Sequence, residues 1–187
     1  MAEWLPEAEG PRPPDDRRAE AAHWHRLAAQ DLEAGRYRSA REKFGRALET
    51  WRQLGDRAGE AAAWHGLASL DLEEGDYRAA RSHFVTALEI WRQLGDRAGE
   101  AAAFFQLGAL AARQGRLADG ARLVAVCCLI EQGIGHPDTE EDYRQLREIV
   151  AELGLTPERY LAWLREVAEG YGRDGGVALI EAAFAGL

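Results

Sequence analysis

The chain has 187 residues, of which 47% are hydrophobic and 29% charged, and its formal net charge is −9 at pH 7. This length and composition are typical of one soluble globular domain. The acidic balance argues against nucleic acid or an anionic membrane as the main partner. The sequence has neither an apolar run long enough to span a bilayer nor a secretory signal at its start. We therefore expect a cytoplasmic location, and the use of arginine rather than lysine everywhere except Lys43 indicates a bacterial source with a GC-rich genome.

Residues 1–15 combine four prolines with acidic residues and glycine and show no apolar periodicity. Such a segment is typical of a flexible or extended leader. Its large apolar pair, Trp4 and Leu5, either packs on the first helix or forms an exposed docking peptide. We favour packing, because chain termini are usually either tied down or without function.

After the leader, the sequence repeats with a period of 40 residues: the stretch 51–63, WRQLGDRAGEAAA, recurs letter for letter at 91–103. A fixed period of about 20 to 50 residues is typical of a solenoid, in which each unit buries its apolar face against its neighbours. We predict three units, 16–55, 56–95 and 96–135, each opened by an aspartate that caps a helix: Asp16, Asp56 and Asp96.

Each unit is predicted to contain two helices joined by a glycine turn. The turn glycines are Gly35, Gly75 and Gly115. Apolar residues follow at helical spacing on both sides of each turn. Small residues at one matching position of the second helix allow the two helices to approach closely, so that aromatic side chains fill the space between units: Ala40, Ala80 and Gly120.

The second unit carries a recognisable pattern, with a tryptophan, a leucine and an alanine on its first helix and a glycine, aromatic and small residues after the turn: Trp64, Leu67, Ala68, Gly75, Tyr77, Ala80, Phe84 and Ala87. The first unit repeats it at Trp24, Leu27, Ala28, Gly35, Tyr37, Ala40, Phe44 and Ala47. This pattern resembles the tetratricopeptide repeat, in the longer-period variant seen in kinesin light chains and bacterial signalling proteins. The resemblance covers residues 16–135 and implies an all-α fold, a right-handed solenoid of helical hairpins.

The third unit departs from its sisters in its second helix, where Cys127, Cys128 and Glu131 replace Ala87, Leu88 and Trp91. Terminal repeats are expected to be atypical because their outer side faces something different. Residues 136–187 then predict three more helices, the first opened by Thr139 in a capping-box-like arrangement with Asp142 and closed by Gly154, the second starting at Thr156-Pro157 and the third at Val177. We predict that they form a C-terminal helical cap on the last repeat.

No residue pattern supports catalysis, a metal site or a cofactor. His23 and His25 are two apart on a helix and point in nearly opposite directions, so they cannot share a metal ion. The sequence has no HExxH, CxxC or Cys-x-x-His spacing. Cys127 and Cys128 occupy an apolar helix, where buried cysteine behaves as a small hydrophobe. We therefore predict a protein that is not an enzyme.

The resemblance implies that the first helix of each unit lines the concave face. The positions carried over are His25, Ala29, Leu32 and Glu33 in the first unit, His65, Ser69, Leu72 and Glu73 in the second, and Phe105, Ala109, Ala112 and Arg113 in the third, with Ala22, Ala62 and Ala102 beside them. Of the residues that the family's carboxylate clamp needs, only Arg113 is comparable. We expect a groove for an extended or helical peptide with apolar anchors and basic residues; the alternative is a solvated inner face without a ligand.

Three functions follow as hypotheses. The first is an adaptor or scaffold that binds a protein or peptide on the concave face. The second is a sensor arm of a bacterial signalling ATPase or transcription regulator, acting as a fragment or in trans. The third is self-assembly, since repeated surfaces, a basic first unit and an acidic cap allow head-to-tail stacking.

Overall fold

The computed structural model describes residues 14–137 and 139–185, and this part of the chain consists of nine helices without strands. They are α1 (Pro14–Glu33), α2 (Tyr37–Leu54), α3 (Arg57–Glu74), α4 (Tyr77–Leu94), α5 (Arg97–Arg113), α6 (Leu117–Ile134), α7 (Thr139–Glu152), α8 (Pro157–Asp174) and α9 (Val177–Ala183). The predicted all-α class is confirmed. None of these helices is long and apolar enough to cross a membrane. The leader residues 1–13, with Trp4 and Leu5, lie outside the described part of the chain.

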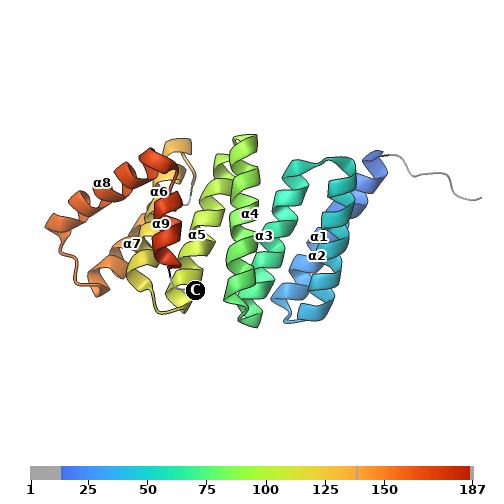
Figure 1. Ribbon diagram of the computed structural model, residues 1–187, viewed down its shortest axis with the longest axis horizontal. Helices are drawn as coiled ribbons and strands as arrows, with labels where there is room; N and C mark the ends of the chain where they lie inside the picture. Colours follow the sequence, from blue (N-terminus) through green and yellow to red (C-terminus); the bar gives the residue numbers. More distant parts are fainter. Residues whose placement is uncertain (1–13, 138, 186–187) are drawn as a thin grey trace, which may run out of the picture.

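The helices form a row of antiparallel hairpins. α1 packs on α2, α3 on α4 and α5 on α6, and the second helix of each hairpin packs on the first helix of the next. The row is elongated, with α1 near one end and α8 at the other (Figure 1). The array is therefore a helical-hairpin solenoid, as predicted.

Glycine and aspartate set the helix ends. The turn glycines Gly35, Gly75 and Gly115 all have positive φ, between 69° and 80°, a backbone region that glycine enters without a steric penalty. Asp56 and Asp96 cap α3 and α5, their carboxylates accepting from the amides three residues on at 3.0 and 2.9 Å. These predictions are confirmed.

Two predicted caps are wrong. α1 begins at Pro14, so Asp16 lies inside its first turn, where its carboxylate still faces the positive end of the helix dipole. Proline is tolerated at the first helical position, which lets the helix extend into the proline-rich segment. Thr139 opens α7 as expected, but its hydroxyl donates to the carbonyl of His136 at 2.7 Å instead of accepting from the helix.

Successive hairpins are held together by aromatic rings against glycine. A Cβ atom at Gly59 would lie 2.4 Å from the Trp51 ring, and one at Gly99 would lie 2.5 Å from the Trp91 ring. Both tryptophans are buried at the end of their hairpins. Since no side chain fits between ring and backbone, these two contacts fix how closely one hairpin approaches the next.

Trp64 was expected between units, and it does contact the core on both sides, but it is only half-buried. The guanidinium of Arg52 lies 4.8 Å from its ring centroid, and the His83 ring stacks on it at 4.8 Å. The fully buried aromatic rings of the first two units are Phe44 and Phe84.

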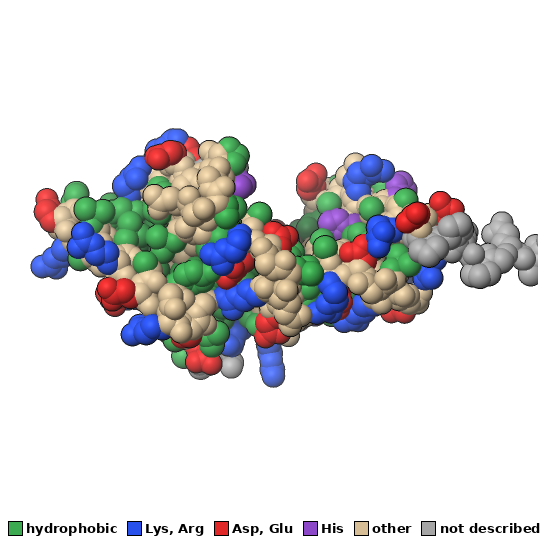
Figure 2. Space-filling view, turned by 90° about the horizontal axis from the view of Figure 1, so that it is seen from above, with side chains coloured by type: hydrophobic (Ala, Val, Ile, Leu, Met, Phe, Trp, Pro, Cys, Tyr) green, Lys and Arg blue, Asp and Glu red, His purple; other side chains and the backbone are tan. Residues whose placement is uncertain are grey.

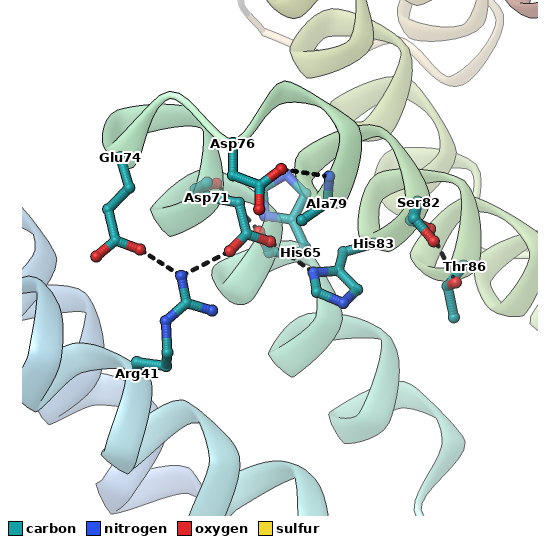
Figure 3. Close-up of polar contacts among 10 residues, drawn as sticks. Arg41, His65, Asp71, Glu74, Asp76, Ala79, Ser82, His83 and Thr86 are labelled. Atoms are coloured by element: carbon teal, nitrogen blue, oxygen red, sulfur yellow. Dashed lines mark hydrogen bonds and ion pairs between the residues drawn. The ribbon is translucent and has the colours of Figure 1, made fainter. Parts of the chain in front are cut away.

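A buried carboxylate links the first two units (Figure 3). Asp71 on α3 has a side chain only 2% exposed; Arg41 of α2 donates to it at 2.7 Å and His83 of α4 at 2.6 Å. Burial alone would raise the pKa of Asp71, but the hydrogen bonds from His83 and Arg41 lower it, so the carboxylate stays ionised. Removing either donor would leave a buried charge with fewer partners, which is costly.

The C-terminal helices cover the third unit. α7, α8 and α9 all pack on α6. Arg92 at the end of α4 donates to the carbonyl of Gly175, and the Tyr171 hydroxyl donates to Glu100 at 2.9 Å. Arg116 donates to the carbonyls of Ala182 and Ala185 at 2.9 and 2.8 Å. The cap is thus tied to both the second and the third unit.

Two glycines give a matched test of this packing. A Cβ at Gly66 would lie 2.3 Å from the buried Phe44 ring. A Cβ at Gly45, on the exposed face of α2, would have no atom within 4 Å. We predict that Gly66→Ala lowers the free energy of unfolding by about 1–3 kcal/mol through overpacking. Gly45→Ala should raise it by about 0.5–1 kcal/mol through helix propensity. Urea denaturation measures both, and equal effects of the two substitutions would contradict the packing described here.

Candidate functional site

The first helices of the hairpins line a hollow of about 510 Å³, here called the groove hollow. It brings together seven of the twelve predicted positions: Leu32, Glu33, Ser69, Leu72, Glu73, Ala109 and Arg113. They come from α1, α3 and α5, which lie next to one another along the array. The space-filling view shows one long edge of the molecule hollowed, with histidine side chains on both sides (Figure 2).

Charges in the groove hollow are partly paired. Arg113 donates to Glu73 at 2.7 Å, with side chains 47% and 41% exposed. Such an exposed pair contributes little to stability, about 0–1 kcal/mol, and can be exchanged for a ligand's charges. Glu33 is exposed and has no ion pair among the described residues. The groove hollow therefore offers one uncompensated carboxylate and one ion pair that a ligand can open.

The two predicted groove histidines are half-buried side chains that pack between aromatic rings. His25 lies 5.2 Å from Phe44 and 5.5 Å from Trp51, and its Nε2 lies 3.2 Å from the carbonyl oxygen of Ala62. His65 repeats this arrangement against Phe84 and Trp91 in the second unit, at 5.3 and 5.5 Å. Burial lowers the pKa of both, that of His65 to about 4. His25 and Ala29 line none of the three hollows described here.

A second hollow, of about 450 Å³, lies between α5, α6 and α7 and is here called the Glu131 hollow. His65 and Phe105 line it together with residues that were not predicted as a site: Cys127, Glu131, His136, Glu141 and Asp142. Phe105 takes the place that His25 and His65 have in the other units, and Glu131 takes the place of Trp51 and Trp91. The hollow thus occurs at the junction where the large ring is missing, and Phe105 remains 37% exposed.

A third, small apolar hollow of about 130 Å³ continues from Phe105 along α5, α6 and α7. Its lining is made mostly of small and aliphatic groups, among them Ala109, Ala112, Val124 and Ile149. Because Phe105 borders both this hollow and the Glu131 hollow, the concave side offers an apolar recess next to an acidic one.

The cysteines are buried, as predicted, at 1% and 0% exposure. Burial raises the pKa of Cys127 well above its usual range and that of Cys128 to about 12, so both are thiols at neutral pH. Burial and the adjacent carboxyl of Asp142 raise the pKa of Glu131 to about 7. Sequence reasoning missed this acidic cluster, although the replacement of a tryptophan by glutamate at a junction position was visible.

These helical hairpins define an all-α helical-repeat protein. A tetratricopeptide repeat model matches residues 19–85 and again residues 59–119. The chain therefore belongs to the tetratricopeptide repeat family, whose repeats generally mediate protein–protein interaction. No curated protein matches the chain.

The depressed pKa of His65 makes stability depend on pH. The unfolded chain takes up a proton near pH 6.5 and the folded chain only near pH 4, so the stability that the neutral imidazole contributes is lost as pH falls through this window. At pH 5 this loss amounts to about 2 kcal/mol. We predict that His65→Phe, which copies Phe105, loses less stability than wild type between pH 7 and pH 5 in urea denaturation.

Glu131 has a raised pKa, so its contribution to stability increases as pH falls through the same window. Wild type and His65→Phe both contain Glu131, and its contribution cancels in the difference between their pH dependences. A parallel pH dependence of the two proteins would show that the His65 ring is not held neutral.

Proposed function

We propose that the protein is a non-catalytic adaptor or scaffold, located in the bacterial cytoplasm, that binds a peptide or protein partner on its concave face. The family is typically a non-catalytic interaction module, which supports this reading. The observation that carries the proposal is the row of three hollows along α1, α3, α5 and α7. The exposed ring of Phe105 borders the Glu131 hollow and the small apolar hollow, and Ala109 lines both the small apolar hollow and the groove hollow.

The chemistry of the hollows favours a peptide with an apolar anchor and basic residues. The small apolar hollow has room for one aliphatic side chain, with Phe105 at its border. Carboxylates lie on either side: Glu33 and Glu73 in the groove hollow, Glu141 and Asp142 in the Glu131 hollow. An apolar anchor in a desolvated recess commonly supplies most of the binding energy, and surrounding charges then select the partner.

A sensor arm is the second candidate, because the Glu131 hollow, at about 450 Å³, is large enough for a small molecule. Such a ligand would raise the melting temperature by mass action, whereas a peptide adaptor would not respond to metabolites. Self-association, the third candidate, would give a molar mass in light scattering that rises with protein concentration.

Two exposed hydrophobic residues provide a matched test. Phe105 borders two hollows, whereas Leu94, at the end of α4, lines none of the three and is 47% exposed. We predict that a partner captured from a lysate of the source organism binds Phe105→Glu at least about tenfold more weakly than wild type, since a charge replaces an anchor contact. Leu94→Glu should bind the partner as wild type does.

Calorimetry with the purified partner quantifies this difference, and circular dichroism confirms that both variants are folded. Equal binding by wild type and Phe105→Glu would exclude the two hollows that Phe105 borders as the anchor site and would contradict the proposed mode of binding.

A further inference from the structure

Three potential ligand atoms meet at the junction of α6 and α7. The Sγ of Cys127 and carboxylate oxygens of Glu131 and Asp142 all lie within 4.8 Å of one another. Cys127 and Glu131 are four residues apart on α6, so their side chains lie one turn apart on the same face. Asp142, in the first turn of α7, faces them from the neighbouring helix. Cys127 and Glu131 are buried, at 1% and 8% exposure, and Asp142 is half-buried.

The Glu131 carboxylate is buried without full compensation. Its Oε2 atom is inaccessible and has no hydrogen-bond partner among the described residues, and its side chain is 10% exposed. Its Oε1 atom lies 3.9 Å from Nδ1 of His136. A buried acceptor without a donor is costly, and here it borders the Glu131 hollow. A buried carboxylate oxygen without a donor is expected to bind an ion, a water molecule or another ligand.

The same three positions are apolar at both earlier junctions. Forty residues before the cluster stand Ala87, Trp91 and Ala102, and forty residues before those stand Ala47, Trp51 and Ala62. In the second unit Ala87 and Trp91 are buried in the core. At the third junction, residue types that bind metals therefore stand at three positions that are apolar in the earlier units.

We propose that Cys127, Glu131 and Asp142 form a binding site for a divalent transition metal of the zinc type. A thiolate with two carboxylates fits Zn²⁺ better than Mg²⁺ or Ca²⁺, which take oxygen ligands. Tetrahedral zinc places such ligand atoms roughly 3.5 Å apart. In this structure the ligand atoms lie up to 4.8 Å apart. Small side-chain rotations would bring them to the spacing that tetrahedral zinc requires.

When the metal ion binds, the Cys127 thiol releases its proton to water. The metal ion drives this deprotonation because it stabilises the thiolate. The Glu131 hollow leaves the fourth coordination position open to water or to a side chain of a partner. The metal would then lie at the end of the concave face, next to Phe105.

The test uses Co²⁺ and Zn²⁺ with the full chain, kept reduced by a phosphine. Co²⁺ bound to a thiolate gives a charge-transfer absorption band that carboxylate or histidine sites lack. We expect one Co²⁺ per chain, with this band, displaced by Zn²⁺, and a melting temperature raised by Zn²⁺. Cys127→Ala, which copies Ala87 of the second unit, should remove the band, whereas the adjacent Cys128→Ala should keep it.

Asp142→Asn supplies an independent variant, because Asp142 is half-buried and its amide analogue has the same size. It should weaken Co²⁺ binding at least about tenfold, the smallest loss usual for groups that support a metal site. The proposal is overturned if folded wild type shows no charge-transfer band, or if Cys128→Ala removes it as Cys127→Ala does. It is equally overturned if Asp142→Asn binds Co²⁺ like wild type.

Discussion

The contact between a tryptophan at the end of one hairpin and a glycine at the start of the next sets the geometry of this array. Trp51 lies against Gly59, and Trp91 lies against Gly99, at distances that leave no room for a Cβ atom. The tryptophan and the glycine of this contact both lie in the stretch 51–63 that recurs letter for letter at 91–103. The spacing of the hairpins therefore repeats as well. The first helices of the units are thereby placed side by side and form the concave face.

At the third junction both members of this contact change together. Glu131 stands where the tryptophans stand, and Thr139 stands where the glycines stand. A tryptophan ring at position 131 would leave no room for the side chain of Thr139. The smaller Glu131 leaves that room, so the two replacements are compatible with each other. The outcome is a hollow lined by Phe105, Glu131 and Asp142 in place of packed aromatic side chains. The departure of the last repeat from its sisters thus locates the recess that we propose as functional.

Much of the fold follows from the sequence because the repeat fixes the register of every helix at once. Aspartate caps and glycine turns then mark most boundaries, as at Asp56 and Gly75. The start of α1 could not be predicted in this way. Pro14 belongs to a segment whose composition is typical of a leader, but proline is also tolerated in the first turn of a helix.

The site was less predictable, for two reasons. The family resemblance implies that His25 and His65 line the inner face, but it does not show that their rings pack between aromatic side chains. Asp142 joins Cys127 and Glu131 only through the docking of α7 on α6, which no spacing within one helix reveals. Comparison of each residue with its counterpart 40 positions earlier was the available signal, since three apolar positions change together.

The most direct test of this description is a double-mutant cycle on Glu131→Trp and Thr139→Gly, measured by urea denaturation. If the third junction is an opened form of the first two, the tryptophan alone should destabilise the protein, and adding the glycine should restore stability, with a coupling free energy of at least about 1 kcal/mol. Additive effects of the two substitutions would show that α7 does not dock on α6 as α3 docks on α2, and would contradict the origin assigned to the hollow.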